Sequence, residues 1–452
     1  MRTFACSLVL SIFTACGGSS TGPDGGAGDG GAPSRSDAGA PIPHVVILVQ
    51  ENHSFDSYFG RWCTAAPGSN PTCTSGPSCC EAAPAKDPEG NSPVVLDDNE
   101  NASFDPNHSQ LCEETEIDDG GMDHFTSGPP VDAGSLWGAC EEPRNFALAG
   151  ADAGELSPYR GWATQYAVAD RYFQPAAGAS SENDMYLAGA RFYFVDNTII
   201  PDSIGYQCTA AAGPPTRFDG GETVADLVIA AGGSFAFYAE GYDALKNADG
   251  TCPPAPADCP FGMPLSPCLY SPGDDPFLFF PQFSAPTDNP KYFKDYDNQF
   301  AADIAAGTLP NVAFVKAVGY KNEHPGYETT ISAGSAFAQR LVNTIESSSY
   351  ASDTLVLITW DEGGGFYDHV PTPPTSTIDE QPYGTRIPLL AIGPYAKKNF
   401  ISHVTMEHSS LVKFLEWDFT GKTGQLGARD TQVNNIGSLL DPAVVGVAVP
   451  EN

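Results

Sequence analysis

The chain has 452 residues and a formal net charge of −35, from 21 basic and 56 acidic side chains. A uniformly acidic surface repels phosphate backbones and anionic lipids, which argues against nucleic-acid binding and against nonspecific adsorption to anionic membranes. The charge is compatible with a solvent-exposed enzyme outside the cytoplasm and with the binding of divalent cations.

The N-terminus predicts export. After one arginine, a short apolar run at 4–13 is typical of a secretory signal and is too short for a membrane span. The sequence FTAC, which ends at Cys16, resembles a bacterial lipoprotein processing site, so we expect residues 1–15 to be a signal peptide and Cys16 to be lipidated. Residues 16–43 have the composition of a flexible linker. The expected location is the bacterial cell envelope, as an outer-membrane or periplasmic lipoprotein, or the medium. Membrane contact is expected only through Cys16.

The cysteine count also favours an exported protein. Without Cys6 and Cys16, ten of the twelve cysteines remain. They are Cys63, Cys73, Cys79, Cys80, Cys112, Cys140, Cys208, Cys252, Cys259 and Cys268. An even number predicts up to five disulfides. The alternative is a zinc site, although the spacings around Cys73 do not match a paired C-x₂-C pattern.

The first predicted strand is an unbroken apolar run at 45–49, typical of a strand buried on both faces of a sheet. The polar residues that follow it include Glu51 and Asn52. Ligands of open α/β sheets collect beyond the carboxyl ends of the strands, so these two side chains are candidate metal or substrate ligands. The alternative is that Asn52 or Ser54 caps the next helix.

Residues 61–145 have little periodic apolar pattern. They predict a long loop region between two elements of the fold, held together by disulfides, which we call the excursion. A helix is expected over 158–173, followed by a turn of small residues that contains Ser180. Serine is a weak nucleophile unless a base or a metal activates it. The alternative for Ser180 is a helix cap.

The remaining elements alternate between strands and helices. Buried strands are expected at 311–318, 354–360 and 387–393, and helices at 223–231, 333–348 and 409–419. This alternation predicts an α/β fold with a mostly parallel central sheet flanked by helices and with disulfide-stapled loop insertions. We expect one domain over residues 44–452.

Asp361 and Glu362 follow the strand at 354–360 directly. Adjacent carboxylates repel each other unless a cation compensates them, and oxygen ligands suit Mg, Ca or Mn. The alternative is a solvated turn. His108 and His324 also lie beside acidic or turn residues, and histidine can donate to phosphate oxygens or protonate a leaving group.

Several sequence motifs resemble those of a known family. HVVILVQENHSFDSYFG and LITWDEGGGFYDHVPTP resemble two motifs of the bacterial phosphoesterase family that contains phosphatidylcholine-type phospholipases C and a respiratory-burst-inhibiting acid phosphatase. GASSENDMYLAGA is similar to its serine motif. NEHPGYE, TRIPLLAIGPYAKK and MEHSSLVKFLEW are similar to further blocks in the same order, and the resemblance covers about 44–420.

The resemblance implies an alkaline-phosphatase-like fold and a metal-dependent hydrolase of phosphate esters. One divalent cation (Ca, Mg, Mn or Zn) would be surrounded by Glu51, Asn52, Ser180, Asp361 and Glu362. Ser180 would be the nucleophile and would pass through a phosphoserine-like intermediate. His108 and His324 would contact the phosphoryl oxygens or serve the leaving group. Asp368, His369 and Arg386 would support the site or pack beneath it.

Some features depart from the family. Asp184 stands where the family prefers a basic residue, and no histidine pair precedes Lys291. The apolar segment PFLFF at 276–280 is a candidate collar for lipid tails. The substrate, a phospholipid or a small phosphomonoester, is therefore left open, and no prediction is made about the oligomeric state. The alternative function is a non-catalytic surface lipoprotein that uses the same fold as a binding module.

Overall fold

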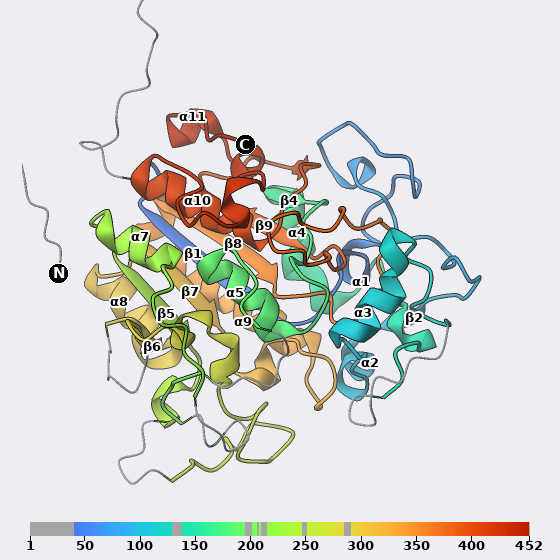
Figure 1. Ribbon diagram of the computed structural model, residues 1–452, viewed down its shortest axis with the longest axis horizontal. Helices are drawn as coiled ribbons and strands as arrows, with labels where there is room; N and C mark the ends of the chain where they lie inside the picture. The colour runs from blue at the N-terminus through green and yellow to red at the C-terminus, as the bar shows by residue number, and fades with distance from the viewer. Residues whose placement is uncertain are drawn as a thin grey trace, which may run out of the picture. The chain divides into compact units, whose positions relative to one another are not determined.

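The computed structural model describes residues 40–128, 138–194, 201–205, 208, 215–245, 251–283 and 291–451. The predicted signal peptide and Cys16 lie outside these residues. The centre of the fold is an eight-stranded sheet with the order β10-β4-β9-β8-β1-β7-β5-β6 (Figure 1). Its strands are β1 (His44–Gln50), β4 (Ala167–Ala169), β5 (Phe235–Ala239), β6 (Phe293–Asp295), β7 (Val312–Lys316), β8 (Thr354–Trp360), β9 (Leu389–Ile392) and β10 (Phe400–Ser402).

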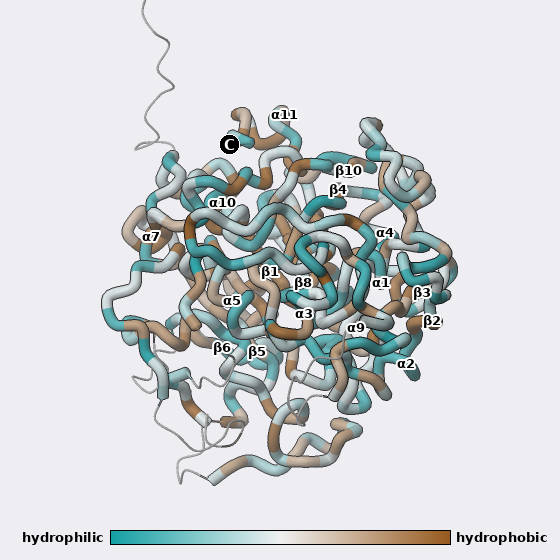
Figure 2. Tube along the Cα trace, turned by 45° about the vertical axis from the view of Figure 1, so that its right-hand side comes forward, coloured by the Kyte–Doolittle hydropathy of each residue, from teal (hydrophilic) through white to brown (hydrophobic). Residues whose placement is uncertain are grey.

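Most of the sheet is parallel. β1 pairs in parallel with both β7 and β8, and the only antiparallel strand among the described pairs is β9, which runs opposite to β4 and β8. Every residue of β8 and the last six residues of β1 are buried, as expected for strands covered on both faces. Figure 2 shows these two strands in the interior of the fold. The predicted α/β class with a mostly parallel sheet is confirmed.

Helices cover both faces of the sheet. On one side α10 packs against α5 and α7, whereas α9 packs against α4. The helices are α1 (Phe55–Phe59), α2 (Asp98–Ser103), α3 (Gln110–Ile117), α4 (Ser157–Gln165), α5 (Ser180–Gly189), α7 (Val224–Ala230), α8 (Ala301–Ala306), α9 (Ile331–Glu346), α10 (His408–Thr420) and α11 (Pro442–Val445). Within the described residues, no helix is long and apolar enough to cross a membrane.

The helix expected over 158–173 is too long. It ends at Gln165, and Ala167–Ala169 instead form β4 between β9 and β10. Pairing with two strands that come more than two hundred residues later outweighs the local helical pattern, because a buried backbone must satisfy its hydrogen bonds.

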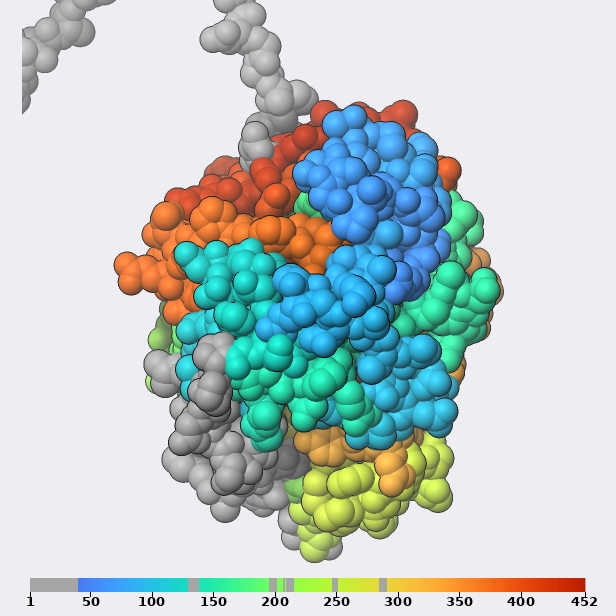
Figure 3. Space-filling view, turned by 90° about the vertical axis from the view of Figure 1, so that its right-hand side faces the viewer, coloured from blue at the N-terminus to red at the C-terminus, as the bar shows by residue number. Residues whose placement is uncertain are grey.

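The excursion after α1 carries a short parallel pair, β2 (Val94–Leu96) and β3 (Ala147–Ala149). Figure 3 shows this part of the chain, blue to blue-green, spread over one side of the molecule. The ten cysteines form five disulfides, which confirms the disulfide prediction over the zinc alternative. The pairs are Cys63–Cys80, Cys73–Cys79, Cys112–Cys140, Cys208–Cys252 and Cys259–Cys268.

The predicted lipid collar at 276–280 is wrong. Phe277, Phe279 and Phe280 are fully buried. The ring of Phe277 packs against those of Phe235 and Phe314 on strands of the sheet. Burial removes more apolar surface from water than an exposed collar would, so these rings serve the core.

Candidate active site

Three neighbouring parallel strands end at the same edge of the sheet and bring polar side chains together there. Glu51 and Asn52 follow β1, Asp361 and Glu362 follow β8, and Lys316 is the last residue of β7. All five side chains are at most 1% exposed. Such an edge is where ligands bind in open α/β sheets, so the arrangement defines a candidate active site.

The glycines after Glu362 allow the two strand ends to approach each other. A Cβ atom on Gly364 would lie 2.6 Å from the Cβ of Asn52, and the φ angle of Gly364 is +65°. Only glycine tolerates both the contact and this backbone conformation without strain. Asn52 itself has a φ of 56°, a left-handed conformation that asparagine adopts more readily than most residues.

Ser180, at the start of α5, completes the cluster. It is the first residue of α5, after Ala179 at the N-cap, so the side chain is not a cap. Its Oγ donates to Glu362 Oε1 at 2.9 Å and lies 3.2 Å from Glu51 Oε2 and 3.5 Å from Asn52 Oδ1. Three of the other predicted metal ligands therefore meet at the Ser180 hydroxyl, and Asp361 is joined to them through the backbone N–H groups of Asn52 and Glu362. The cap role falls to Ser54, which accepts from Ser57 N at the start of α1.

The electrostatics of the cluster favour a bound cation. Burial, together with the charges of neighbouring carboxylates, raises the pKa values of Asp361 and Glu362 well above their usual range. Burial also opposes the ionisation of Glu51, but the charges of Lys316 and His324, together with hydrogen bonds, outweigh it, and the pKa of Glu51 is lowered. A divalent cation among these groups would compensate the buried negative charge.

The amide of Asn52 fits the same interpretation. Its oxygen faces acceptors only, and exchanging the amide atoms would create hydrogen bonds to Glu51 Oε2 at 2.7 Å and Asp361 Oδ1 at 3.3 Å. In the orientation present, three oxygen atoms converge instead. Converging carboxylate and amide oxygens are the donor set of a hard divalent cation, so the residues fit the metal that the motifs predict.

His108 and His324 lie beside Asn52. Each ring has its Nδ1 atom 2.8 Å from a backbone carbonyl oxygen, of Pro106 and Pro325 respectively. Each therefore turns Nε2 towards Asn52 Nδ2, at 3.4 Å in both cases. Burial lowers the pKa of His324, but the charges of Asp105 and Glu51 raise it more, and the net shift is upward. The carbonyl contacts place a proton on Nδ1 and leave Nε2 to face the site.

The other predicted supporting residues form a separate buried network. Arg386 donates to Asp368 Oδ1 at 2.8 Å and to Asp56 Oδ1 at 3.0 Å, and His369 Nδ1 lies 2.7 Å from Asp56 Oδ2. Asp56 belongs to α1, so this network fixes the helix that follows the first strand. It holds the fold beneath the site and contributes no group to the Ser180 cluster.

Three residues of the site were not predicted from the sequence. Lys316 forms a buried ion pair with Glu51. Glu113 accepts from the backbone N–H groups of Gly178 and Gly365, at 2.7 and 3.2 Å, and joins the serine loop to the glycines after Glu362. Glu323 accepts from the Tyr159 hydroxyl at 2.5 Å and anchors the segment of His324. Only Lys316 had a local signal, a charge within an apolar run.

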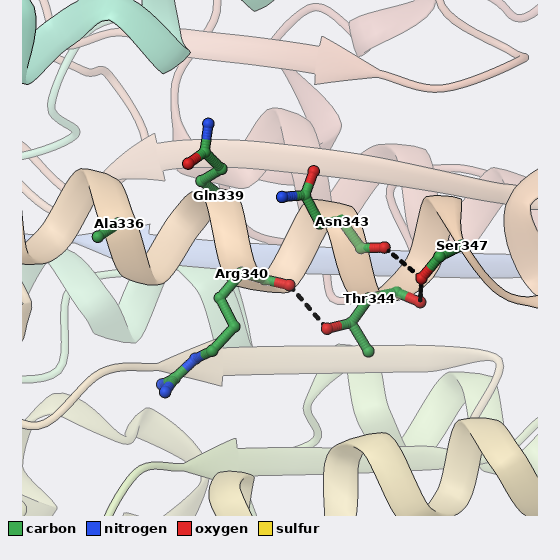
Figure 4. Close-up of a pocket in the computed structure, with 6 residues that line it drawn as sticks. All are labelled: Ala336, Gln339, Arg340, Asn343, Thr344 and Ser347. Atoms are coloured by element: carbon green, nitrogen blue, oxygen red, sulfur yellow. Dashed lines mark hydrogen bonds between the residues drawn. The ribbon is translucent and has the colours of Figure 1, made fainter.

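A surface hollow lies elsewhere, on the outer face of α9 (Figure 4). It is lined by Ala336, Gln339, Arg340, Asn343, Thr344 and Ser347. Helix α9 supplies five of these residues and Ser347 caps its C-terminus, and none of the six belongs to the Ser180 cluster. The convergent chemistry of the described residues is therefore at the strand ends.

Comparison with known proteins identifies the family of the chain. The model of the phosphoesterase family matches residues 42–420. Non-specific phospholipase C1 of Arabidopsis thaliana is 24% identical over 86% of this chain and 69% of its own length. Non-hemolytic phospholipase C of Burkholderia pseudomallei is 24% identical over 84% of this chain, which spans 55% of that protein.

Solved structures show a more distant likeness. A putative sulfatase from Bacteroides thetaiotaomicron aligns with a TM-score of 0.36 and 13% identity, over 64% of this chain and 69% of its own. A protein of the alkaline phosphatase superfamily from Vibrio parahaemolyticus aligns with a TM-score of 0.32 and 12% identity, over 62% and 65%. The α/β fold itself rests on the sheet described above.

Proposed function

The chain belongs to the phosphoesterase family and is a hydrolase of phosphoric ester bonds, and we propose that it cleaves its substrates with Ser180 as nucleophile and one divalent cation. The observation that carries the proposal is the position of the Ser180 hydroxyl, within 3.5 Å of oxygen atoms from Glu51, Asn52 and Glu362. Two separate strand ends converge on one half-buried hydroxyl, which a structural serine does not require.

Glu51, Asn52, Asp361 and Glu362 would hold the cation, with Ser180 as the fifth ligand. When bound, a divalent cation stabilises negative charge on oxygen and makes a serine hydroxyl nucleophilic at modest pH. Mg, Ca, Mn and Zn all accept such oxygen ligands. Ser180 donates its proton towards Glu362 Oε1, and its Oγ attacks phosphorus as the ester oxygen leaves.

The first turn of α5 assists this step. Because Ser180 is the first residue of α5, the free backbone N–H groups of this turn and the positive end of the helix dipole would favour a phosphoryl group on the Ser180 hydroxyl. His324, whose pKa is raised, would supply a proton from Nε2 to the leaving oxygen, and His108 would bind a phosphoryl oxygen. Water then hydrolyses the phosphoserine and restores the Ser180 hydroxyl.

The names of the relatives support a phospholipase C type of substrate, so we propose cleavage of the bond between phosphorus and the glycerol oxygen of a glycerophospholipid, which releases diacylglycerol and the phosphorylated headgroup. The assay compares p-nitrophenyl phosphate with p-nitrophenylphosphorylcholine, each with and without added divalent metal. Preference for the choline ester supports the phospholipase, and preference for the monoester makes the enzyme a phosphatase. Activity on neither ester would leave only the binding-module alternative.

Ser180→Ala tests the nucleophile, with Ser181→Ala as the matched control from the same helical turn. We expect the first variant to lose activity by at least about a thousandfold and the second to stay within a few-fold of the wild type. Equal activity of the Ser180→Ala variant and the wild type would remove Ser180 from this role.

We also propose export of the chain, with a lipid anchor at Cys16 and one phosphoesterase domain after the linker. The five disulfides support export, since such bonds persist mainly in oxidising compartments. Metabolic labelling with a fatty acid tests the anchor. Label that survives in a Cys16→Ser variant contradicts it.

A further inference from the structure

Lys316 is a charged residue at a position where the sheet otherwise holds apolar side chains. It ends β7, whose other residues are Val312, Ala313, Phe314 and Val315, and it is 1% exposed. A buried ammonium is costly unless a negative charge compensates it. Its partner is Glu51, one of the proposed cation ligands.

The two oxygen atoms of Glu51 have different neighbours. Oε1 is paired with Lys316 Nζ, whereas Oε2 lies 3.2 Å from Ser180 Oγ. The ion pair therefore directs one oxygen away from the cluster and the other towards the nucleophile. Glu51 can offer a cation at Ser180 only one oxygen while Lys316 holds the other.

The surrounding charge is strongly negative. Besides the proposed ligands, Asp184 faces the same region from α5, one helical turn after Ser180, and is 1% exposed. Among the described residues, neither Asp184 Oδ2 nor Asp361 Oδ2 has a hydrogen-bond partner. A phosphate ester is an anion, so this many carboxylates around one divalent cation would repel it.

We infer that Lys316 is a positioning residue that acts through Glu51: its ammonium reserves Oε1, aims Oε2 at Ser180, and offsets enough negative charge for an anionic phosphate to approach the cation. This inference rests on the proposed function, because it assigns Lys316 a task at that same cation site. It also explains why this chain tolerates Asp184, since Lys316 supplies positive charge to the same cluster.

The test measures binding of two probes by titration calorimetry, without turnover. Mn²⁺ is titrated into the metal-stripped protein, and inorganic phosphate into the Mn²⁺-loaded protein. Lys316→Met should bind Mn²⁺ at least about tenfold more tightly, because a repelling charge is gone, and phosphate at least about tenfold more weakly. Lys316→Arg keeps the charge, so its dissociation constants for Mn²⁺ and for phosphate should be close to those of the wild type.

Lys413→Met is the matched control. Lys413 is 4% exposed and donates to the carbonyl of Val433 at 2.7 Å, so it is also a buried lysine, but it lies on α10 and outside the cluster. Both constants should stay unchanged in this variant. Circular dichroism and thermal unfolding establish that each variant is folded, and Lys316→Gln replaces Lys316→Met if the latter does not fold.

The opposite directions of the two changes separate the inference from a structural role. Loss of packing would weaken the binding of Mn²⁺ and of phosphate together. That result, or no change in the binding of either probe, overturns the inference. If neither neutral variant folds, the Lys316→Arg variant is the test. A large loss of phosphate affinity in that variant overturns the inference, because the variant keeps the positive charge. A wild-type protein that binds no divalent cation would instead contradict the proposed function.

Discussion

The backbone N–H of Asn52 donates to Asp361 Oδ1 at 3.0 Å. These residues are 309 positions apart in the chain, and each follows a central strand of the sheet. The bond joins the two pairs of proposed ligands directly. It therefore helps to align the site, and a bound cation would add charge compensation.

Asp361→Asn should separate stability from metal binding. The amide keeps an acceptor for Asn52 N. It also removes an ionisable carboxyl, whose pKa is raised by burial and by the charge of Glu51. We expect the metal-free protein to gain about 1–3 kcal/mol in free energy of unfolding at pH 7. The rise in Tm on adding Mn²⁺ should disappear. Asp303→Asn, at a half-buried surface pair with Lys294, is the control and should keep that rise.

Glu323 should make stability depend on pH. Burial raises the pKa of its carboxyl from 4.5 to about 8, although hydrogen bonds from Tyr159, Tyr58 and Trp360 lower it. A carboxyl with a raised pKa in the folded state stabilises the protein fully below its unfolded pKa, and this contribution is lost as pH rises through about 8. The free energy of unfolding should therefore fall between about pH 5 and 8, by at most about 1.4 kcal/mol per pH unit from this group.

Glu323→Gln tests that assignment by urea unfolding at several pH values. In this variant an amide NH₂ must face hydrogen-bond donors that meet a carboxyl oxygen of Glu323 in the wild type, so we expect a loss of about 1–3 kcal/mol at pH 5. The slope of stability against pH should become shallower than in the wild type. An unchanged slope would show that other groups carry the pH dependence.

Arg386 should matter more for stability than any exposed arginine. It is fully buried between Asp56 and Asp368, and its removal leaves Asp368 without its ion pair and Asp56 with His369 alone. Arg386→Met should cost about 3–5 kcal/mol in denaturant unfolding. Arg340→Met removes a side chain that is 48% exposed and paired with Glu240, and should cost no more than about 1 kcal/mol. Similar losses in the two variants would contradict the structural role of the buried network.

Local patterns were sufficient for the central strands and for the position of the polar residues that follow them. Glu51 and Asp361 each stand directly after a predicted strand, so their placement needed only the rule that parallel strands share an edge. β4 could not be predicted, because Ala167–Ala169 become a strand only by pairing with β9 and β10. Glu113 could not be predicted either, since its partners Gly178 and Gly365 are brought to it by the tertiary fold.

The disulfide Cys112–Cys140 should influence catalysis through Glu113. Cys112 precedes Glu113 in α3, so the disulfide holds the helix whose carboxylate joins the serine loop to the glycines after Glu362. Replacing both cysteines with alanine should lower stability by about 2–4 kcal/mol and kcat/KM by roughly tenfold or more, because the nucleophile and its ligands are less well aligned.

The matched control is the Cys73–Cys79 pair, which spans six positions instead of 28 and lies outside α3. Its double alanine variant should keep kcat/KM within a few-fold of the wild type. Glu113→Ala tests whether the Cys112–Cys140 disulfide acts through Glu113. If it does, the losses of kcat/KM in this variant and in the Cys112/Cys140 double alanine variant should not add when the changes are combined. Additive losses in the combined variant would mean that the disulfide stabilises the excursion alone. A non-additive loss would show that an insertion outside the central sheet aligns the two site loops on either side of Ser180.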